Sequence, residues 1–297
     1  MTGLRQLLAG AAVASAMVLA GGAAGAESQL HVQVITGSEP GFLANATLVS
    51  GEKDAILVDA GFTLADAHRI AGAILDARRN LTTVYVTHFH PDHYFGVVVI
   101  KQAFPKAKLV ALPATVADIK KSWQGKVKQW GPMYGDNLTT KPVIPAALTG
   151  TTLTLEGQTL EIHGPTQGDA PTNSYVWISS LKTAIAGDIV YSGVYPWTAE
   201  TDATTRQAWI KTLDELAAYG PTAVVAGHRD PRLPADDPAA LAQTRAYLLA
   251  FDEAAAASKT ADDLEAKMKA KYPGLELPII LHIAATSQFA QAASAKK

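Results

Sequence analysis

The stretch Val84-Tyr85-Val86-Thr87-His88-Phe89-His90-Pro91-Asp92-His93 is an apolar run that ends in three histidines and an aspartate. The apolar residues before Thr87 predict a short buried strand, and Pro91 disfavours further strand or helix where the polar residues begin. We therefore expect the polar residues on a loop at the carboxyl end of a strand. On an extended backbone His88 and His90 point to the same side, so two imidazoles can bind one cation.

Asp92 and His93 follow the proline, where the chain can turn toward a second position close by. Zinc binds neutral imidazole nitrogen and carboxylate oxygen, and this stretch supplies four such groups within six residues. A surface loop that happens to be rich in histidine is the alternative, but the H-x-H-x-D-H spacing is specific. The stretch predicts a metal site with His88, His90, Asp92 and His93 as ligands.

H-x-H-x-D-H after an apolar strand resembles the signature of the metallo-β-lactamase fold superfamily, and the resemblance runs from about His31 to beyond His228. It implies an α/β fold, namely a four-layer αββα sandwich of two packed mixed β-sheets with outer helices. The alternation of apolar strands and amphipathic helices along the chain agrees with this fold class. The motif indicates the fold more strongly than it indicates the substrate.

One order of elements occurs twice in the chain. An apolar strand, a helix and a second apolar strand precede Thr87-His88, and the same order precedes Gly227-His228, with Gly187-Asp188 after its first strand. If the halves pack as two sheets, these strand ends meet at one edge. The resemblance implies that Asp188 bridges two metal ions and that His228 completes the second site. Taken alone, Asp188 would be read as a turn residue and His228 as a capping or core residue.

The sequence departs from the superfamily at one expected ligand. The resemblance implies a third histidine for the first metal, from a Gly-His-Thr turn, but residues 164–169 read GPTQGD. Counting back from Asn173 places Gln167 at that position. An amide oxygen is a poorer zinc ligand than imidazole, so we expect a weaker first site unless Asp169 or His163 contributes. The expected content is one firmly held zinc ion, or two of unequal affinity.

Asp59 also follows an apolar strand, and we expect it to orient a ligand histidine rather than to bind metal. The remaining histidines are expected to be structural or solvated: His31, His68, His163 and His282.

Residues 1–26 contain one positive charge, Arg5, then an apolar run of small residues from Leu7 to Leu19, and they end in Ala24-Gly25-Ala26. This pattern predicts a secretory signal peptide that is cut after Ala26, and hence an exported, periplasmic protein. An uncleaved N-terminal anchor is the alternative. No later stretch is long and apolar enough to span a membrane, so we expect no stable span in the mature chain.

Residues 27–297 are enough for a single metallo-β-lactamase-fold domain with a mainly helical C-terminal segment from about residue 235. Loss of Arg5 leaves 24 of the 25 basic residues against 27 acidic ones, a net charge near −3. A nucleic-acid partner would call for a basic face, so none is expected. The chain has no cysteine, which excludes disulfides and thiolate ligands.

Residues 113–145 predict a helix followed by an irregular segment that begins near Gly131-Pro132. The segment contains Trp123 and Trp130, seven residues apart. They are expected either to line a substrate pocket over the metals or to form one helix face against the core.

These features together predict a zinc-dependent hydrolase that uses a metal-bound hydroxide on a small ester, lactone or related carbonyl substrate. Asp92 would hold the hydroxide and pass its proton to the leaving group. The aspartate at position 188 favours ester or lactone hydrolysis, because the resemblance associates it with lactonases and thioesterases and cysteine with many β-lactamases. The alternatives are a β-lactam hydrolase and a catalytically retired periplasmic metal-binding or ligand-binding module. The sequence indicates neither a cofactor beyond the metal nor an oligomeric state.

Overall fold

The apolar strands of the first half form a six-stranded sheet in the computed structural model, which describes residues 29–294. The predicted signal peptide, residues 1–26, lies outside the described residues. Strands β1 to β3 are antiparallel neighbours, and β3 to β6 are parallel, so the sheet is mixed. The strands follow each other in chain order: β1 (His31–Thr36), β2 (Asn45–Ser50), β3 (Asp54–Val58), β4 (Asn80–Val86), β5 (Lys108–Ala111) and β6 (Ala146–Ala147).

The second half forms a five-stranded mixed sheet in the order β12-β10-β9-β8-β7, in which β10 and β12 are parallel. Two short strands pair separately at its end. The strands are β7 (Thr152–Leu155), β8 (Gln158–Thr166), β9 (Asn173–Ile178), β10 (Thr183–Ile185) and β12 (Ala223–Val225), with β11 (Tyr191–Ser192) and β13 (His228–Arg229) as the separate pair.

The two sheets pack face to face around a buried apolar core. Ile56 of β3 and Tyr85 of β4 belong to the same cluster as Val176 of β9 and Ile185 of β10. Alternate residues of the same strands point the other way, because successive side chains of a strand face opposite sides. Each sheet therefore has a second apolar face that helices must cover.

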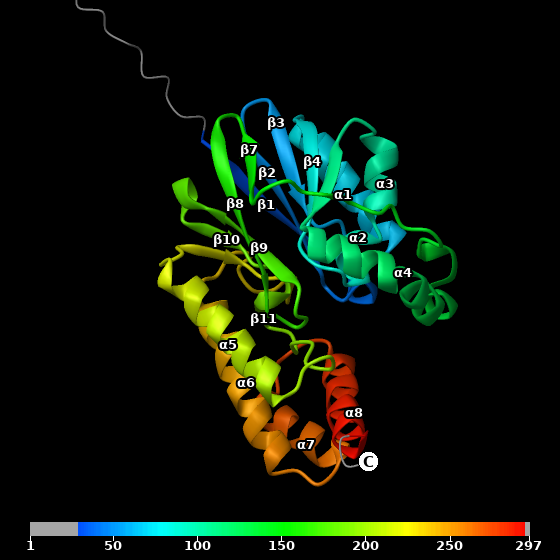
Figure 1. The fold of residues 1–297 in the computed structure, drawn as a ribbon, viewed down its shortest axis with the longest axis vertical. Coiled ribbons are helices and arrows are strands. Elements are labelled where there is room, and N and C mark those ends of the chain that lie inside the picture. Colours follow the sequence, from blue (N-terminus) through cyan, green and yellow to red (C-terminus); the bar gives the residue numbers. More distant parts are fainter. Residues whose placement is uncertain (1–28, 295–297) are drawn as a thin grey trace, which may run out of the picture.

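Helices cover both outer faces (Figure 1). On the first sheet they are α1 (Leu64–Ala77), α3 (Val97–Ala103) and α4 (Pro113–Tyr134). On the second they are α5 (Ala203–Ala218) and α6 (Ala239–Ala256), followed by α7 (Ala261–Lys271) and α8 (Pro278–Ser294). The shorter helices are η1 (Glu39–Gly41), α2 (Pro91–Tyr94), η2 (Gly135–Asn137), η3 (Ser179–Leu181) and η4 (Gly187–Ile189). The four layers confirm the predicted αββα sandwich.

Helix α4 is longer than predicted. It continues through Gly131 and Pro132 to Tyr134 instead of ending at them. Pro132 has no backbone N–H to donate to the carbonyl of Lys128, and its ring crowds that carbonyl, so this last turn needs other contacts to stay helical. Ring contacts hold this turn on the core, because the centroids of Trp130 and Tyr134 lie 5.9 and 4.9 Å from that of Phe62.

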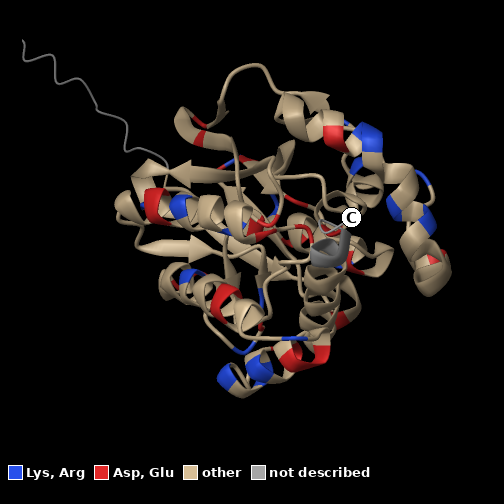
Figure 2. Cartoon of the chain, turned by 60° about the horizontal axis from the view of Figure 1, so that its bottom comes forward, with Lys and Arg blue, Asp and Glu red and all other residues tan. Residues whose placement is uncertain are grey.

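Helices α6, α7 and α8 occupy most of residues 239–294, so the C-terminal segment is mainly helical. They lie at the far end of the molecule from β3 and β7 (Figure 1). None of the helices in residues 29–294 combines the length and the apolar character that a membrane crossing requires. Basic and acidic residues are interspersed over the outer helices (Figure 2).

Candidate metal centre

The histidine motif lies where β4 ends. His88 and His90 belong to the loop after Val86, whereas Asp92 and His93 lie in α2. The prediction of a loop throughout was therefore wrong for the second half of the motif. Pro91 is the first residue of α2, a position where a proline loses no helical hydrogen bond.

The second half of the chain supplies its residues in the same way. β10 leads into η4, which contains Asp188, and β12 leads through Gly227 to His228. Asn45 at the start of β2 ties this region to the first sheet. Its backbone N–H donates to Gly227 O at 2.7 Å, and its side-chain Nδ2 donates to Ala226 O at 2.8 Å. The two similar units of the sequence thus bring their strand ends to one edge.

One group of possible metal ligands consists of His88, His90, Asp169 and Asp188, all of them buried. The Nδ1 atom of His90 lies 2.8 Å from Asp169 Oδ2, and Nε2 of His88 lies 3.6 Å from Asp188 Oδ2. The ligand atoms lie within 4.8 Å of one another, a spacing that allows one cation to contact all of them.

The other group consists of Asp92, His93 and His228. The Nε2 atom of His228 lies 3.4 Å from both Asp92 Oδ2 and His93 Nε2. Asp188 stands between the groups, because its Oδ1 lies 3.1 Å from His93 Nε2 and its Oδ2 lies 3.2 Å from His228 Nε2. All six residues predicted as ligands therefore come together, with Asp188 in the shared position.

The ring nitrogens that point away from the two groups have partners of their own. Such outer contacts fix the tautomer and orientation of ligand histidines. They are Thr87 Oγ1 at 3.0 Å from His88 Nδ1, Glu200 Oε2 at 3.4 Å from His90 Nε2, Asp59 Oδ2 at 2.8 Å from His93 Nδ1, and Phe42 O at 2.6 Å from His228 Nδ1.

Asp59 has the orienting place that the sequence predicts. Besides contacting His93, its carboxylate accepts hydrogen bonds from the backbone N–H and the hydroxyl of Thr87, both at 2.8 Å. Its backbone has a φ of 61°, a left-handed conformation that aspartate tolerates better than most residues. One side chain therefore fixes both the start of the histidine loop and the ring of His93.

Divalent cations fit the donor set. The Nε2 atom of His88 is buried and has no hydrogen-bond partner among the described residues. The Nδ1 atoms of His93 and His228 face the acceptors Asp59 Oδ2 and Phe42 O. In neutral rings that donate there, the two Nε2 atoms, 3.4 Å apart, both present lone pairs, and a cation between them satisfies both. Imidazole nitrogens mixed with carboxylate oxygens are the ligands that zinc prefers.

Asp169, and not Gln167, occupies the position of the missing histidine. The Gln167 side chain turns away and donates from Nε2 to Gly168 O at 2.9 Å, so the assignment of that position to Gln167 was wrong. The Asp169 carboxylate is held by Asn173 Nδ2 at 2.9 Å and lies 3.3 Å from the hydroxyl of Tyr191. The same hydroxyl lies 2.8 Å from Asp188 Oδ2, so Tyr191 links the two carboxylates.

The histidines predicted to be structural or solvated lie outside both groups. His163 is half-buried, and His31, His68 and His282 are exposed.

The metallo-beta-lactamase superfamily is the family whose model matches this chain, over residues 40–228, well over half of its length. The chain belongs to that superfamily. With the histidine and aspartate groups, this membership makes the protein a metal-binding hydrolase of the metallo-beta-lactamase fold. A comparison with curated proteins gives no match.

Solved structures of other superfamily members share the fold. A metallo-beta-lactamase family protein from Thermus thermophilus is 20% identical, with a TM-score of 0.64 over 90% of this chain and 94% of that chain. The DIM-1 metallo-beta-lactamase is 19% identical, with a TM-score of 0.54 over 74% and 92%. A metallo-beta-lactamase from Pontibacter korlensis is 20% identical, with a TM-score of 0.55 over 74% and 99%.

Burial and close charges shift the pKa values of the ligand groups strongly. Burial lowers the pKa of His88 well below its usual value, and the neighbouring His93 adds to the effect. Burial also opposes charging of His90, but the Asp169 carboxylate and then Glu200 outweigh it and raise its pKa to about 10. Burial raises the pKa of Asp169 to about 6, against the effect of His90. In the metal-free site, His90 is therefore protonated at neutral pH and faces the Asp169 carboxylate.

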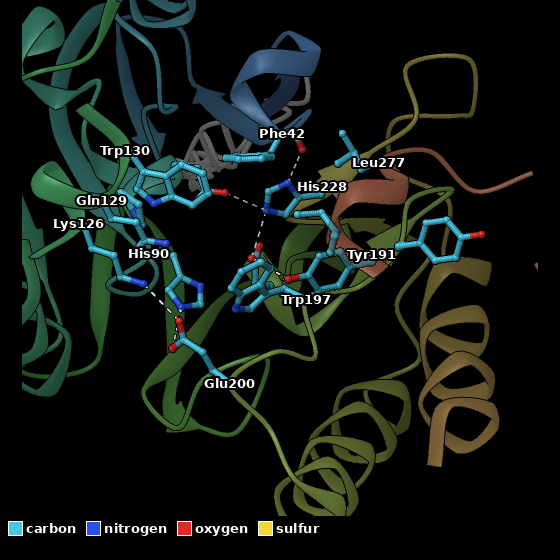
Figure 3. A pocket seen from close by; sticks show the side chains of 15 residues that line it. Phe42, His90, Lys126, Gln129, Trp130, Tyr191, Trp197, Glu200, His228 and Leu277 are labelled. Atoms are coloured by element: carbon cyan, nitrogen blue, oxygen red, sulfur yellow. Dashed lines mark hydrogen bonds and ion pairs between the residues drawn. The ribbon is translucent and has the colours of Figure 1, made fainter. Parts of the chain in front are cut away.

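A pocket lies over the ligands. The predicted ligands Asp92, Asp188 and His228 line the part of it that we call the floor. Trp130, Phe42 and Trp197 line its walls (Figure 3). Trp130 thus fits the first of the two roles considered for the tryptophans, whereas Trp123 packs on the core. Glu200, Tyr191, Leu277 and Ile280 also line the pocket, although no sequence motif identifies them.

Proposed function

We propose that this superfamily member is a zinc-dependent hydrolase of small esters or lactones. The observation that supports the proposal is the arrangement of two ligand groups about Asp188, under a pocket lined by both polar and apolar side chains. Bound zinc would polarise the carbonyl and lower the pKa of a water molecule to near neutrality. His88, His90, Asp169 and Asp188 would hold one ion, and Asp92, His93, His228 and Asp188 the other.

The protein residues divide the remaining work. Asp92 lies at the pocket floor and is only half-buried, so its carboxylate can accept a proton from the attacking water and return it to the leaving group. In the metal-free site, burial and the nearby carboxylates Asp169 and Asp188 raise the pKa of Tyr191 well above its usual value, so its hydroxyl is protonated. The hydroxyl lies 2.8 Å from Asp188 and 3.3 Å from Asp169, so its hydrogen bond helps to position these carboxylates. Trp130 and Trp197 limit the access of water to the reacting carbonyl.

β-Lactam hydrolysis is the second candidate, because two structurally similar proteins are metallo-beta-lactamases. Their identity to this chain is 19–20%, which supports a common fold and not a common substrate. A retired binding module is the third, and it would retain metal without turnover. The buried, complete ligand groups favour an enzyme over this alternative.

Steady-state hydrolysis of phenyl acetate, a γ-lactone and a β-lactam by the zinc-loaded protein tests the proposal. We expect ester or lactone turnover that is lost on chelation, restored by zinc, and at least about 100-fold lower in Asp92→Asn. Glu253→Gln, at an exposed carboxylate remote from the ligands, is the matched control. Turnover of the β-lactam alone would favour the second candidate, and zinc binding without turnover of any substrate would favour the third.

We also propose that the mature protein is exported, since residues 1–26 have the pattern of a signal peptide. Expression of the full chain in a Gram-negative host, followed by N-terminal sequencing of the periplasmic fraction, is expected to find Glu27 as the first residue. Recovery of the uncut chain in the cytoplasm would contradict this.

A further inference from the structure

Charge in the pocket is balanced at its mouth. Lys126 is the only lysine or arginine among the described residues that line the pocket. Its Nζ lies 3.2 Å from Oε1 of Glu200, and this ion pair joins α4 to the segment before α5 (Figure 3). The Lys126 ammonium also lies 5.8 Å above the ring of Phe89. The one lysine or arginine side chain of this lining that could attract an anionic group of a substrate is therefore already paired.

The carboxylates among the metal ligands also reduce the positive charge that the pocket floor would have with two zinc ions bound. Asp92, Asp169 and Asp188 are three carboxylates, whereas two divalent ions bring four positive charges. A neutral histidine in place of Asp169 would leave the loaded floor one unit more positive. The pocket thus offers an anion less attraction than a site of the same fold with three histidines around its first metal.

The pocket walls are apolar and come from separate parts of the chain. Phe42 precedes β2, Trp130 lies on α4, and Trp197 lies between β11 and α5. Leu277 directly precedes α8 and Ile280 lies in its first turn, and both lie beyond residue 228, where the family match ends. Burial of an aryl or alkyl group against such walls is favourable because it removes apolar surface from water.

We infer that the substrate is an uncharged ester or lactone with an apolar aryl or alkyl group, and that Glu200 disfavours anionic substrates by neutralising Lys126. The inference rests on the proposed hydrolase function and narrows its substrate class. Glu200 is a specificity-determining residue in this account, because its charge decides whether Lys126 is available to a substrate carboxylate. β-Lactams, which carry a carboxylate, are disfavoured for the same reason.

The ratio of kcat/KM for 4-carbamoylphenyl acetate and 4-carboxyphenyl acetate tests this, with zinc-loaded wild type beside Glu200→Gln. Glutamine keeps the size of the side chain and a hydrogen-bonding group near His90, and it removes the charge. We expect the wild type to favour the neutral ester. Glu200→Gln should shift the ratio about fivefold toward the anionic ester, through a lower KM for that ester. The size of the shift corresponds to a partly exposed ion pair of about 1 kcal/mol. The two esters differ in the intrinsic reactivity of their leaving groups, but this difference is the same for both proteins and cancels when their ratios are compared.

Two controls identify the source of the shift. Lys126→Gln in the Glu200→Gln background is expected to return the ratio to the wild-type value, because the freed ammonium is gone. Glu253→Gln, an exposed carboxylate outside the pocket, is expected to leave it unchanged. A ratio that stays within twofold of wild type in Glu200→Gln overturns the inference.

A binding measurement separates this inference from the proposed function. Neutral acetanilide and anionic 4-acetamidobenzenesulfonate are titrated into the zinc-loaded protein. A sulfonate binds zinc only weakly, so the comparison reports the effect of probe charge in the pocket. Tryptophan fluorescence records the binding, since Trp130 and Trp197 line the pocket. Tighter binding of acetanilide, reduced or reversed in Glu200→Gln, supports the inference even if no ester is hydrolysed, in which case the hydrolase proposal fails. Ester hydrolysis with equal binding of both probes retains the hydrolase and overturns the charge selectivity.

Discussion

Replacement of Gly227 by alanine should dislodge the shared carboxylate. A Cβ atom at this position would lie 2.0 Å from Asp188 Oδ1 and 2.6 Å from the carbonyl carbon of Gly187, whereas real Cβ contacts essentially never fall below 3.0 Å. The carboxylate oxygen must therefore move by at least 1.0 Å, the difference between 3.0 and 2.0 Å. Gly227 is not among the glycines with positive φ, so the expected effect is steric.

Zinc–oxygen bonds tolerate changes of only about 0.2 Å, so a shift of this size removes Asp188 from both groups. We expect zinc affinity to fall by at least about 100-fold, or about 2.7 kcal/mol, and the metal-free protein to lose about 1–3 kcal/mol of stability. Competition with a chromophoric chelator measures the affinity, and urea unfolding measures the stability.

Gly72→Ala in α1 is the matched control, because its Cβ meets nothing within 4 Å. It should leave zinc affinity unchanged and raise stability by about 0.5–1 kcal/mol, the usual gain of alanine over glycine within a helix. Wild-type zinc affinity in Gly227→Ala would refute the claim that Asp188 binds metal from its observed position.

Three further outcomes are expected. Asp59→Asn should lower zinc affinity about 10–100-fold in chelator competition, because it removes the carboxylate that orients His93; unchanged affinity would contradict that role. Zinc affinity should rise with pH above 7, because the pKa of His90 is raised to about 10 and its proton must leave when metal binds. Calorimetry of zinc binding in two buffers should detect at least about one released proton per chain. No proton release would count against His90 as a ligand. Asp66→Asn should cost about 1–3 kcal/mol at pH 7 by urea unfolding. Burial raises the Asp66 pKa, but hydrogen bonds, first from Thr63, outweigh it, and the net pKa is lowered from 3.8. The stability contribution is therefore present above about pH 4 and is lost as the pH falls through the depressed pKa, so wild type and variant should converge in acid.

The sequence sufficed for the parts of the site that lie at strand ends. The spacing of His88, His90, Asp92 and His93 predicted a metal site, and the repeated order of strand, helix and strand predicted that Asp188 and His228 would join it. Both rest on local patterns, because parallel strands such as β3 and β4, or β10 and β12, bring their carboxyl ends to one edge.

Asp169 shows where counting along the chain fails. Thr166 of β8 pairs with Asn173 of β9, and residues 167–172 form the irregular connection between the two strands. The path of this connection, and not the distance in sequence from Asn173, decides which residue faces His90. Gln167 lies in the same connection, and its side chain bonds to the backbone of Gly168. The position of an irregular turn depends on packing from both sheets, which no local pattern encodes.

The pocket walls were still harder to predict. Glu200 contacts His90 across 110 positions of sequence, and Leu277 reaches the pocket only because three C-terminal helices pack beyond the second sheet. Neither residue belongs to a motif. The sequence allows Trp130 either in the pocket or on the core, and in the structure it both lines the pocket and packs on Phe62.

The number of zinc ions bound per chain tests most directly the claim that Asp169 completes a two-metal site. Wild type, Asp169→Ala and Gln167→Ala would be loaded with excess zinc, freed of unbound metal and analysed by elemental mass spectrometry and native mass spectrometry. The structure predicts two ions in wild type and in Gln167→Ala, and one in Asp169→Ala, with near-wild-type unfolding of the zinc-loaded variants as evidence of an intact fold. Two firmly bound ions in Asp169→Ala, or loss of one in Gln167→Ala, would contradict the account.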